Sequence, residues 1–383
     1  MAKRKVLLYL GKFPGYGMDI DGGSILAYQL IDSLKTRCEL DVVFIRKHHE
    51  TFSDDDVHSI AYVEYLDAEN NKFIRRLENL ETNATALKNY RKYNLIITAH
   101  ISKFFGMNSA GPEFWEKTIL FPMFCTRSYV RAGEVVPYEY TSLEQEVFDH
   151  VAKVITPSFE EAIDLQNDYG CDLHKLIVIP RGITPLIKMR KPVPIHKPLQ
   201  IVCIASIKPQ KNNMGLVYLV EELQNRKTKV VVHFICTIYE RGIYERICHI
   251  IKERHWENCF KFHIAISQKE VAQILLDMDI NVSVSNWETF GRGILEGASA
   301  GLPTFVPERL SVIKRLCGDE NGVFFSNSIK QMADQIMTVT SDPVEYMRLS
   351  IHLAELSKRF SYKLEQERLL NIFLGGDKNG EYQ

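Results

Sequence analysis

Residues 280–306, INVSVSNWETFGRGILEGASAGLPTFV, contain the clearest evidence for the fold class of this chain. Residues 280–284 and 303–306 are short apolar runs that predict two strands, and the turn between them leads into a helix. A strand, a helix and a second strand in this order are the repeating unit of a parallel sheet covered by helices. The turn therefore lies at the carboxyl edge of the sheet, where ligands bind in such folds.

The same alternation of apolar strands and helices runs along the rest of the chain. Further strands are predicted over residues 6–10, 40–45, 95–99, 118–121, 154–156, 176–180, 201–204, 230–235 and 260–262. Helices are predicted from about Ser24, after Pro157-Ser158 and through the tail that follows Pro343. The expected fold class is α/β, with two Rossmann-like, doubly wound parallel-sheet domains facing a central cleft.

A proline-rich, basic segment separates the two halves. Residues 188–198 read KMRKPVPIHKP, which suits an exposed linker. We expect an N-terminal domain over residues 1–185, a linker over 186–198, a C-terminal domain over 199–355 and a last helical segment over 356–383.

Composition excludes several classes of protein. The chain has 383 residues, of which 45% are apolar and 25% charged, a balance typical of globular proteins. No apolar run approaches the ~20 residues of a membrane-spanning helix, and no small-residue cleavage site follows the first apolar run. The net charge of −1 argues against a nucleic-acid partner. Eight scattered cysteines without a CxxC pair indicate buried, reduced thiols in a cytoplasmic protein.

The turn before the helix has the features of a phosphate site. Gly291 and Gly293 let the backbone approach a ligand closely. The helix that follows directs its free N–H groups and its positive dipole end at that point. Glu296 is expected in the first turn of this helix, within reach of sugar hydroxyls beside the phosphate. The alternative is a plain strand–turn–helix with two surface glutamates.

These residues resemble a known family. Glu288 and Glu296, with Phe290-Gly291 between them and the sequence 301–303 after them, resemble the E-x7-E signature of retaining glycosyltransferases with the GT-B fold, family 4 in particular. Residues 150–158 and 175–183 are similar to that family's last N-domain strands. The resemblance covers about residues 150–325.

The resemblance implies the organisation of a donor and an acceptor site. A UDP- or GDP-sugar donor would bind mainly to the C-terminal domain, and an acceptor glycan, lipid, protein or small molecule mainly to the N-terminal domain. The last segment, 356–383, would cross back to the N-terminal domain. The residues expected to contact the donor are Gly22, Gly23, Ser206, Lys208, Lys211, Thr289, Phe290, Gly291, Arg292, Gly293 and Glu296.

The loop after the first C-domain strand departs from the family pattern. Residues 205–212 resemble the G-R-x-x-x-x-K-G loop whose arginine and lysine hold the donor diphosphate. Lys211 matches the lysine, whereas Ser206 stands at the arginine position and Lys208 offers a replacement charge. A solvated basic loop is the alternative. We expect Lys211→Ala to lower activity with little effect on folding, as for an exposed loop lysine.

The resemblance also assigns residues of the N-terminal half. Gly22-Gly23, behind Asp19 and Asp21, resembles a loop that closes over the donor phosphate. His100 matches the family's catalytic histidine at a strand end, with a purely structural histidine as the alternative. Residues 122–124 stand where the family carries a second histidine. The remaining polar candidates on the acceptor side are Arg127 and Arg131.

The expected chemistry needs neither metal nor cofactor. Retaining glycosidases hold two carboxyl groups about 5–5.5 Å apart, whereas eight helical residues span ~12 Å. A double displacement through Glu288 and Glu296 is therefore disfavoured, and the leaving phosphate would accept the acceptor's proton on the same face of the sugar. Glu288 and Lys211, with His100, are the expected catalytic residues. Lys211, loop amides and the helix start would neutralise the diphosphate in place of Mg²⁺.

Two alternative functions are compatible with the sequence, and two local motifs have other interpretations. A GT-B-fold epimerase or phosphorylase is one alternative, and a nucleotide-sugar-binding subunit with degraded chemistry is another, motivated by Ser206. Asp54-Asp55-Asp56 looks like a D-x-D metal motif but lies in a polar loop and is interpreted as surface. Residues 72–93 mix basic and aromatic side chains, which fits an exposed helix pair or a peripheral membrane contact of the N-terminal domain.

Overall fold

The computed structural model describes residues 3–10, 22–46, 62–67, 89–104, 111–123, 125–131, 133, 136, 139–183, 194–318 and 322–375. The chain folds into two compact units. Unit 1 comprises Met1–Arg131, Val135–Pro180 and Glu365–Gln383, and unit 2 comprises Ala132–Glu134 and Arg181–Leu364. Asp19, Asp21, Asp54-Asp55-Asp56 and most of the basic-aromatic segment lie outside the described residues. The domain boundaries expected from the sequence stay predictions.

Unit 1 is built on a parallel sheet of seven described strands in the order β3-β2-β1-β4-β5-β6-β7. The strands are β1 (Lys5–Leu10), β2 (Glu39–Arg46), β3 (Tyr62–Asp67), β4 (Leu95–Thr98), β5 (Thr118–Leu120), β6 (Lys153–Thr156) and β7 (Leu176–Val178). Successive β1 residues point to opposite faces, so Leu7 and Tyr9 belong to one apolar cluster and Val6 and Leu8 to the other. Both faces are therefore buried.

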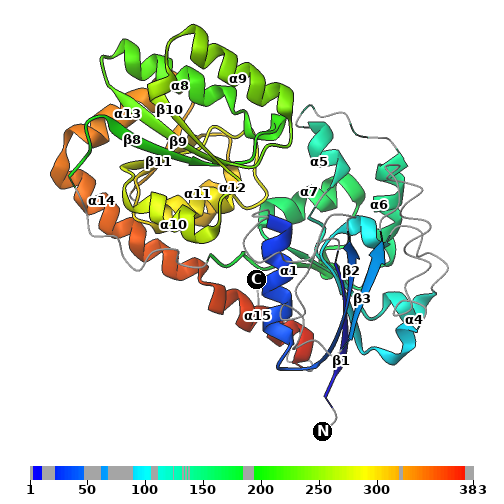
Figure 1. Cartoon of the computed structure of the whole chain (residues 1–383). Helices are drawn as coiled ribbons and strands as arrows, with labels where there is room; N and C mark the ends of the chain where they lie inside the picture. Colours follow the sequence, from blue (N-terminus) through cyan, green and yellow to red (C-terminus); the bar gives the residue numbers. More distant parts are fainter. Residues whose placement is uncertain are drawn as a thin grey trace. The chain divides into compact units, whose positions relative to one another are not determined.

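Helices cover each face of the unit 1 sheet (Figure 1). Helix α1 (Gly22–Leu34) and the last helix, α15 (Tyr362–Leu374), pack on one face, where Leu369 and Phe373 join the cluster around Leu8. The other face is covered by α4 (Pro112–Trp115), α6 (Glu139–His150) and α7 (Phe159–Tyr169). The short helix α5 (Thr126–Arg131) follows β5. Helix α15 thus packs over strand β1.

Unit 2 repeats this design around a parallel sheet of six described strands in the order β10-β9-β8-β11-β12-β13. The strands are β8 (Leu199–Ile204), β9 (Val230–Cys236), β10 (Phe260–Ile264), β11 (Ile280–Val282), β12 (Thr304–Pro307) and β13 (Val323–Ser326). The predicted α/β fold of two Rossmann-like units is confirmed.

The helices of unit 2 form one layer on each side of its sheet (Figure 1). One layer consists of α8 (Met214–Asn225), α9 (Arg241–Glu253) and α13 (Ile329–Ser341), and the other of α10 (Gln268–Leu276), α11 (Arg292–Ser299) and α12 (Ser311–Cys317). Helix α14 (Pro343–Leu356) contributes side chains to both layers. The sheet is therefore buried on both faces, which explains its nearly continuous apolar strands.

The strand order of unit 2 fixes where a ligand would bind. The chain leaves β8 toward β9 on one side, and β11 lies on the other side of β8. In open α/β sheets this reversal opens a crevice at the carboxyl ends of the two strands. The loops at that point are residues 205–213 and 283–291, which contain most of the predicted donor residues.

The sequence missed two strands, β3 and β13. Each is the outermost strand of its sheet, with only one paired neighbour. The β3 sequence YVEYLD includes two acidic residues, and β13 has only four residues. Edge strands are often short and charged because they face solvent along one side, so they lack the strong apolar signal of central strands.

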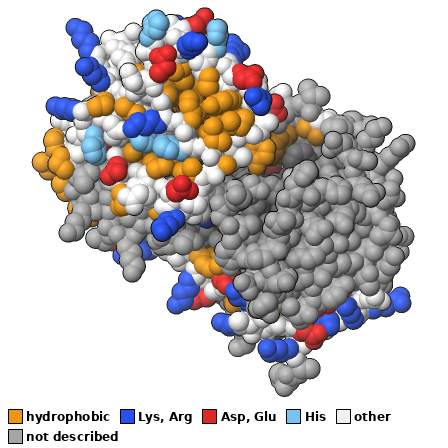
Figure 2. Space-filling view, viewed as in Figure 1, with side chains coloured by type: hydrophobic (Ala, Val, Ile, Leu, Met, Phe, Trp, Pro, Cys, Tyr) orange, Lys and Arg blue, Asp and Glu red, His pale blue; other side chains and the backbone are white. Residues whose placement is uncertain are grey.

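Figure 2 shows apolar side chains gathered between charged ones on the viewed face of unit 2. The exposed large apolar residues of unit 2 are Tyr218, Tyr239, Ile264, Val344, Met347 and Ile351.

None of the helices that the structure describes is long and apolar enough to cross a membrane. All eight cysteines are free thiols, and six of them are buried.

Helix α11 approaches β8 so closely that Gly293 has no space for a side chain. A Cβ atom on Gly293 would lie 2.3 Å from the carbonyl oxygen of Ile204, the last residue of β8. Because the obstacle is backbone rather than a flexible side chain, the helix itself would have to move. The glycine therefore sets the position of the helix start over the carboxyl end of β8.

We predict that Gly293→Ala destabilises the protein by about 1–3 kcal/mol, the usual cost of forcing an atom into a packed interior. Gly242, in α9, is the control because its Cβ would meet no atom within 4 Å. Gly242→Ala should leave stability unchanged or raise it by about 0.5 kcal/mol. Urea denaturation measures both, and equal stabilities for the two variants would contradict this packing account.

Candidate functional site

A mostly buried ion pair joins the two loops at the carboxyl edge of the unit 2 sheet. Lys211 Nζ lies 2.7 Å from Glu288 Oε1 and 2.6 Å from Oε2. Only 14% of the lysine side chain and 9% of the glutamate side chain are exposed. Lys211 belongs to the loop after β8 and Glu288 to the loop after β11, so residues 77 positions apart meet at this edge. The structure thus brings two of the three predicted catalytic residues together.

Hydrogen bonds on either side of this pair hold the two loops in register. The side chain of Gln210 donates from Nε2 to the carbonyl oxygen of Trp287 at 3.1 Å. The backbone carbonyl of Gln210 accepts from the backbone N–H of Asn286 at 2.9 Å. Asn212 donates from Nδ2 to the carbonyl oxygen of Val284 at 3.1 Å. Gln210 is buried, and its Oε1 has no partner within the described part of the chain. Sequence reasoning missed Gln210 and Asn212 because neither residue type signals such a contact from local spacing.

The start of α11 presents a row of unused backbone donors. Gly291 precedes the helix with φ of 78°, in the left-handed region, and a Cβ there would lie 2.4 Å from Ile313 Cδ1. Its carbonyl accepts from Ile294 and Leu295. Among the described residues, the backbone N–H groups of 288–293 donate no hydrogen bond to protein. Such a run of N–H groups at a helix start is suited to an anion.

Glu296 lies one turn deeper than the sequence suggested. The helix begins at Arg292, so Glu296 is its fifth residue, and no acidic residue occupies the first turn. The expectation of a first-turn carboxylate is therefore wrong. Glu296 is buried and accepts from Arg292 Nε at 2.8 Å, while Arg292 Nη1 donates to the carbonyl oxygen of Gly182 at 3.4 Å. Arg292 therefore neutralises Glu296 along one helix face.

Four further predicted donor residues, Ser206, Lys208, Thr289 and Phe290, belong to the same two loops of unit 2. The side chain of Asn213 organises the loop after β8, because it accepts from the Lys208 N–H at 3.0 Å and donates to the Ser206 carbonyl at 3.1 Å. Thr289 is half-buried. Phe290 is buried and packs edge-to-face on Phe360, with ring centroids 6.1 Å apart, so only its backbone is available to a ligand.

The candidates of unit 1 lie at the carboxyl edge of its own sheet. Gly22 and Gly23 open helix α1. His100 follows β4, is half-buried, and accepts at its carbonyl from the Thr98 hydroxyl at 3.3 Å. Arg131 forms ion pairs with Asp164 and Asp168. Because two carboxylates already hold this guanidinium, Arg131 is a weaker acceptor candidate than the sequence suggested.

A buried carboxyl group positions Arg127. Glu144 accepts from the Thr126 backbone N–H at 3.0 Å, from the Thr126 hydroxyl at 2.9 Å and from the Tyr169 hydroxyl. Burial raises the pKa of Glu144, although these hydrogen bonds oppose the shift. Tyr169 also accepts from the Arg127 N–H, and its ring lies 5.0 Å from the Arg127 guanidinium carbon. No local motif indicates the role of Glu144, because its hydrogen-bond partners are 18 and 25 residues away.

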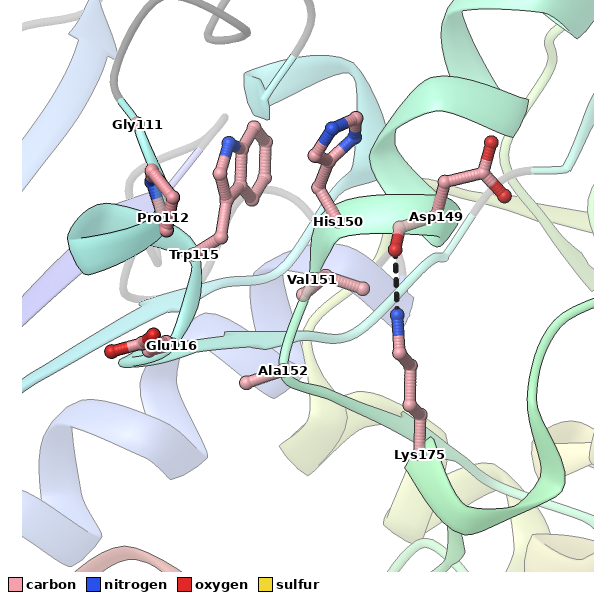
Figure 3. A pocket seen from close by; sticks show the side chains of 9 residues that line it. All are labelled: Gly111, Pro112, Trp115, Glu116, Asp149, His150, Val151, Ala152 and Lys175. Atoms are coloured by element: carbon pink, nitrogen blue, oxygen red, sulfur yellow. Dashed lines mark hydrogen bonds between the residues drawn. The ribbon is translucent and has the colours of Figure 1, made fainter.

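A hollow of about 510 Å³ in unit 1 lies at the opposite edge of the sheet. Its lining comes from α4 and from residues 149–152 and 175, which precede β6 and β7 (Figure 3). Lys175 Nζ donates to the Asp149 carbonyl oxygen at 2.7 Å, so this cation already has a partner. Parallel sheets bind ligands at their carboxyl ends. We therefore place the functional site at the ion pairs of unit 2 and not in this hollow.

The buried thiol of β8 is not a nucleophile. Cys203, in β8, is buried, and its burial raises the pKa of the thiol to about 12. A thiol with this pKa carries almost no thiolate at neutral pH, so it does not attack a sugar. No three His, Cys, Asp or Glu side chains of the described ranges gather in a way that would hold a metal ion.

Residues 187–363 match the family model described as glycosyl transferases group 1. This part of the chain is therefore similar to members of that family. The match includes both loops, both ion pairs and helix α11. The resemblance to glycosyltransferases that was predicted from Glu288 and Glu296 is confirmed as a match to glycosyl transferases group 1.

Two curated relatives from Dictyostelium discoideum match parts of the chain. The "GDP-Man:Man(3)GlcNAc(2)-PP-Dol alpha-1,2-mannosyltransferase" is 22% identical over 171 residues, which are 42% of this chain and 34% of the relative. The "Alpha-1,3/1,6-mannosyltransferase ALG2" is 24% identical over 141 residues, which are 35% of this chain and 34% of the relative. The chain therefore aligns with about a third of the length of each.

Solved structures match nearly the whole chain. The sucrose-phosphate synthase of Thermosynechococcus elongatus has a TM-score of 0.80 at 14% identity, covering 97% of this chain and 98% of that one. Anabaena Alr3699/HepE in complex with UDP-glucose has a TM-score of 0.75 at 14% identity, covering 96% and 98%. WaaG, a glycosyltransferase involved in lipopolysaccharide biosynthesis, has a TM-score of 0.70 at 14% identity, covering 97% and 100%. These likenesses show the GT-B fold.

The mostly buried position of the Lys211 side chain corrects one expectation. The sequence suggested an exposed loop lysine whose loss would barely affect folding, but the side chain is mostly buried against Glu288. Removing one partner of a buried pair leaves the other charge desolvated without compensation. The lysine therefore supports the fold of the loop as well as any ligand.

We predict that Lys211→Ala and Glu288→Gln each destabilise the protein, by about 2–4 kcal/mol for the lysine variant. The double variant should be more stable than the two single losses added together, with a coupling energy of about 1–3 kcal/mol. The exposed pair Arg241–Glu245 is the control, with an expected coupling of about 0.3–0.5 kcal/mol. Denaturant unfolding of the wild type, the two single variants and the double variant of each pair measures both coupling energies. Coupling at Lys211–Glu288 no larger than in the control pair would contradict a buried, interdependent pair.

Proposed function

We propose that the protein is a retaining glycosyltransferase that moves a sugar from a UDP- or GDP-sugar to an acceptor. The observation that carries the proposal is the Lys211–Glu288 pair beside the unused N–H groups of residues 288–293. A sugar linked to a diphosphate needs two kinds of partner close together. Cations and N–H donors suit its phosphates, and carboxylate oxygens suit its hydroxyl groups.

Lys211 can bind a phosphate without leaving Glu288. An ammonium group has three N–H donors, and two of those of Lys211 point to the carboxylate of Glu288. The third remains for a phosphate oxygen. The N–H groups at the start of α11 and the positive end of its dipole add further stabilisation of negative charge. Charge that develops on the leaving diphosphate is thus met by donors already in position.

The two glutamates are assigned to hydroxyl groups of the donor. Each carboxylate oxygen has a second lone pair, so Glu288 can accept from a sugar hydroxyl while it keeps Lys211. Glu296, held by Arg292 at 2.8 Å, keeps acceptor capacity for ribose hydroxyls. In this assignment Glu288 orients the transferred sugar and does not attack it.

The chemical step then needs no covalent sugar–enzyme intermediate. The bond between the anomeric carbon and the diphosphate oxygen breaks while the acceptor hydroxyl bonds to the same face of that carbon. The hydroxyl proton passes to the departing phosphate oxygen, which balances the step. Lys211 and the loop amides take the role that a metal ion has in other transferases, so the reaction is metal-independent in this proposal, and it needs no cofactor.

The donor base and the acceptor class follow from different relatives. The Anabaena protein named above was solved with UDP-glucose, whereas the first Dictyostelium relative is named for GDP-mannose. We therefore keep both nucleotides. The acceptor is a glycan, lipid-linked sugar, protein or small molecule bound through unit 1, with His100 and Arg127 as its polar contacts. Cytoplasmic location and peripheral membrane contact stay predictions of the sequence.

A nucleotide-sugar-binding subunit without turnover is the second candidate. The observation that favours it is Ser206, because a serine stands where the family pattern has the arginine that holds the diphosphate. Ser206 offers only a hydroxyl to a phosphate.

We predict that the purified protein slowly releases UDP or GDP from at least one nucleotide sugar. UDP-glucose, UDP-galactose, UDP-N-acetylglucosamine and GDP-mannose are the donors to test, with free nucleotide measured by chromatography. Excess chelator should change the rate by less than about twofold, equivalent to ~0.4 kcal/mol in the barrier. Glu288→Gln should slow release, and neither protein should gain the mass of a sugar.

Each contrary result points to a different error. Binding of a donor without turnover, with or without simple sugar acceptors, would favour the subunit without chemistry. Loss of activity in chelator would contradict metal independence. A stable sugar adduct on Glu288 in the mass spectrum would contradict the single-step mechanism.

A further inference from the structure

The cations at the carboxyl edge of the unit 2 sheet differ in what they face. Lys211 faces Glu288 and Arg292 faces Glu296, so each of these charges is already balanced by a carboxylate. The diphosphate of a nucleotide sugar carries at least two negative charges at neutral pH. One spare N–H on Lys211 and the loop amides stabilise part of this charge, and Ser206 brings none. An unbalanced cation at the same edge would complete the site.

Arg309 is placed to be that cation. It follows β12, whose neighbour in the sheet is β11, the strand that leads to Glu288. Its Nη2 donates to the carbonyl oxygen of Val284 at 3.3 Å, and the same oxygen accepts from Asn212 Nδ2 at 3.1 Å. Arg309 therefore lies beside the loop that carries Lys211.

No carboxylate faces Arg309 within the part of the chain that the structure describes. Its neighbour Glu308 pairs with Lys314 instead. The Val284 carbonyl is its one hydrogen-bond partner among the described groups, which leaves most of the five N–H donors of the guanidinium unused. Partial desolvation lowers the pKa of Arg309, as expected where no acid offsets it, yet a guanidinium stays charged at any physiological pH.

We propose that Arg309 binds the donor diphosphate and supplies the positive charge that is absent at position 206. This inference rests on the proposed function. The planar guanidinium can hold two phosphate oxygens at once, an arrangement that a lysine cannot reproduce. Arg309 then keeps its bond to Val284 and contacts the ligand with its remaining donors. The phosphate contacts of the site then come from the segments that follow three neighbouring strands, β8, β11 and β12.

Calorimetric titration with UDP and GDP tests the proposal. Arg309→Ala should weaken binding of whichever diphosphate the wild-type protein binds by at least tenfold. Arg309→Gln keeps an N–H donor for the Val284 carbonyl but removes the charge, and it should show nearly the same loss. Arg309→Lys should recover part of the affinity. The control is Arg348→Ala, an exposed arginine paired with Glu345 on α14, which should bind within twofold of wild type.

The outcomes separate this inference from the function on which it rests. A wild-type protein that binds neither UDP nor GDP would overturn both. A wild-type protein that binds a diphosphate, with Arg309→Ala and Arg309→Gln unchanged, would overturn the role of Arg309 alone. Full affinity in Arg309→Gln with a loss in Arg309→Ala would also overturn it, because the residue would then only support the loop.

Discussion

The ion pair between Lys211 and Glu288 is the interaction on which the functional edge of unit 2 depends. It joins the loops that follow β8 and β11, the two strands between which the chain reverses its direction of winding. Because both side chains are mostly buried, removing either partner would leave a desolvated charge and destabilise the protein. The pair therefore holds the loops in place before any ligand arrives, and it sets one cationic and one anionic group side by side.

The backbone around this pair provides what the side chains do not. Gly293 lets α11 approach the end of β8, and Gly291 turns the chain into the helix with a positive φ. The amides between Glu288 and Gly293 are left without acceptors among the described residues. A ligand with a diphosphate next to hydroxyl groups matches this arrangement of amides, lysine and carboxylates. The group 1 family match and the GT-B fold agree with such a ligand.

The sequence predicted the central strands, and it missed the features that depend on contacts with residues of other elements. The strong apolar runs of β1 and β8 revealed buried parallel strands, whereas the outer strands β3 and β13 gave too weak a signal. Glu288 and Lys211 were identified from local motifs, but their contact joins residues 77 positions apart. For the same reason the burial of Lys211, the role of Gln210 and the partners of Arg309 were not visible in local spacing.

Hydrogen exchange of the backbone amides, with and without saturating UDP or GDP, tests whether the loops after β8 and β11, with the start of α11, bind the donor diphosphate. In the free protein, the amides of residues 288–293 should exchange fast, since they have no acceptor among the described residues. Once nucleotide binds, exchange should slow markedly there and across 205–213. Peptides that line the hollow of unit 1, residues 111–116 and 149–152, should not change. Unchanged exchange across 288–293 with nucleotide bound would contradict the account.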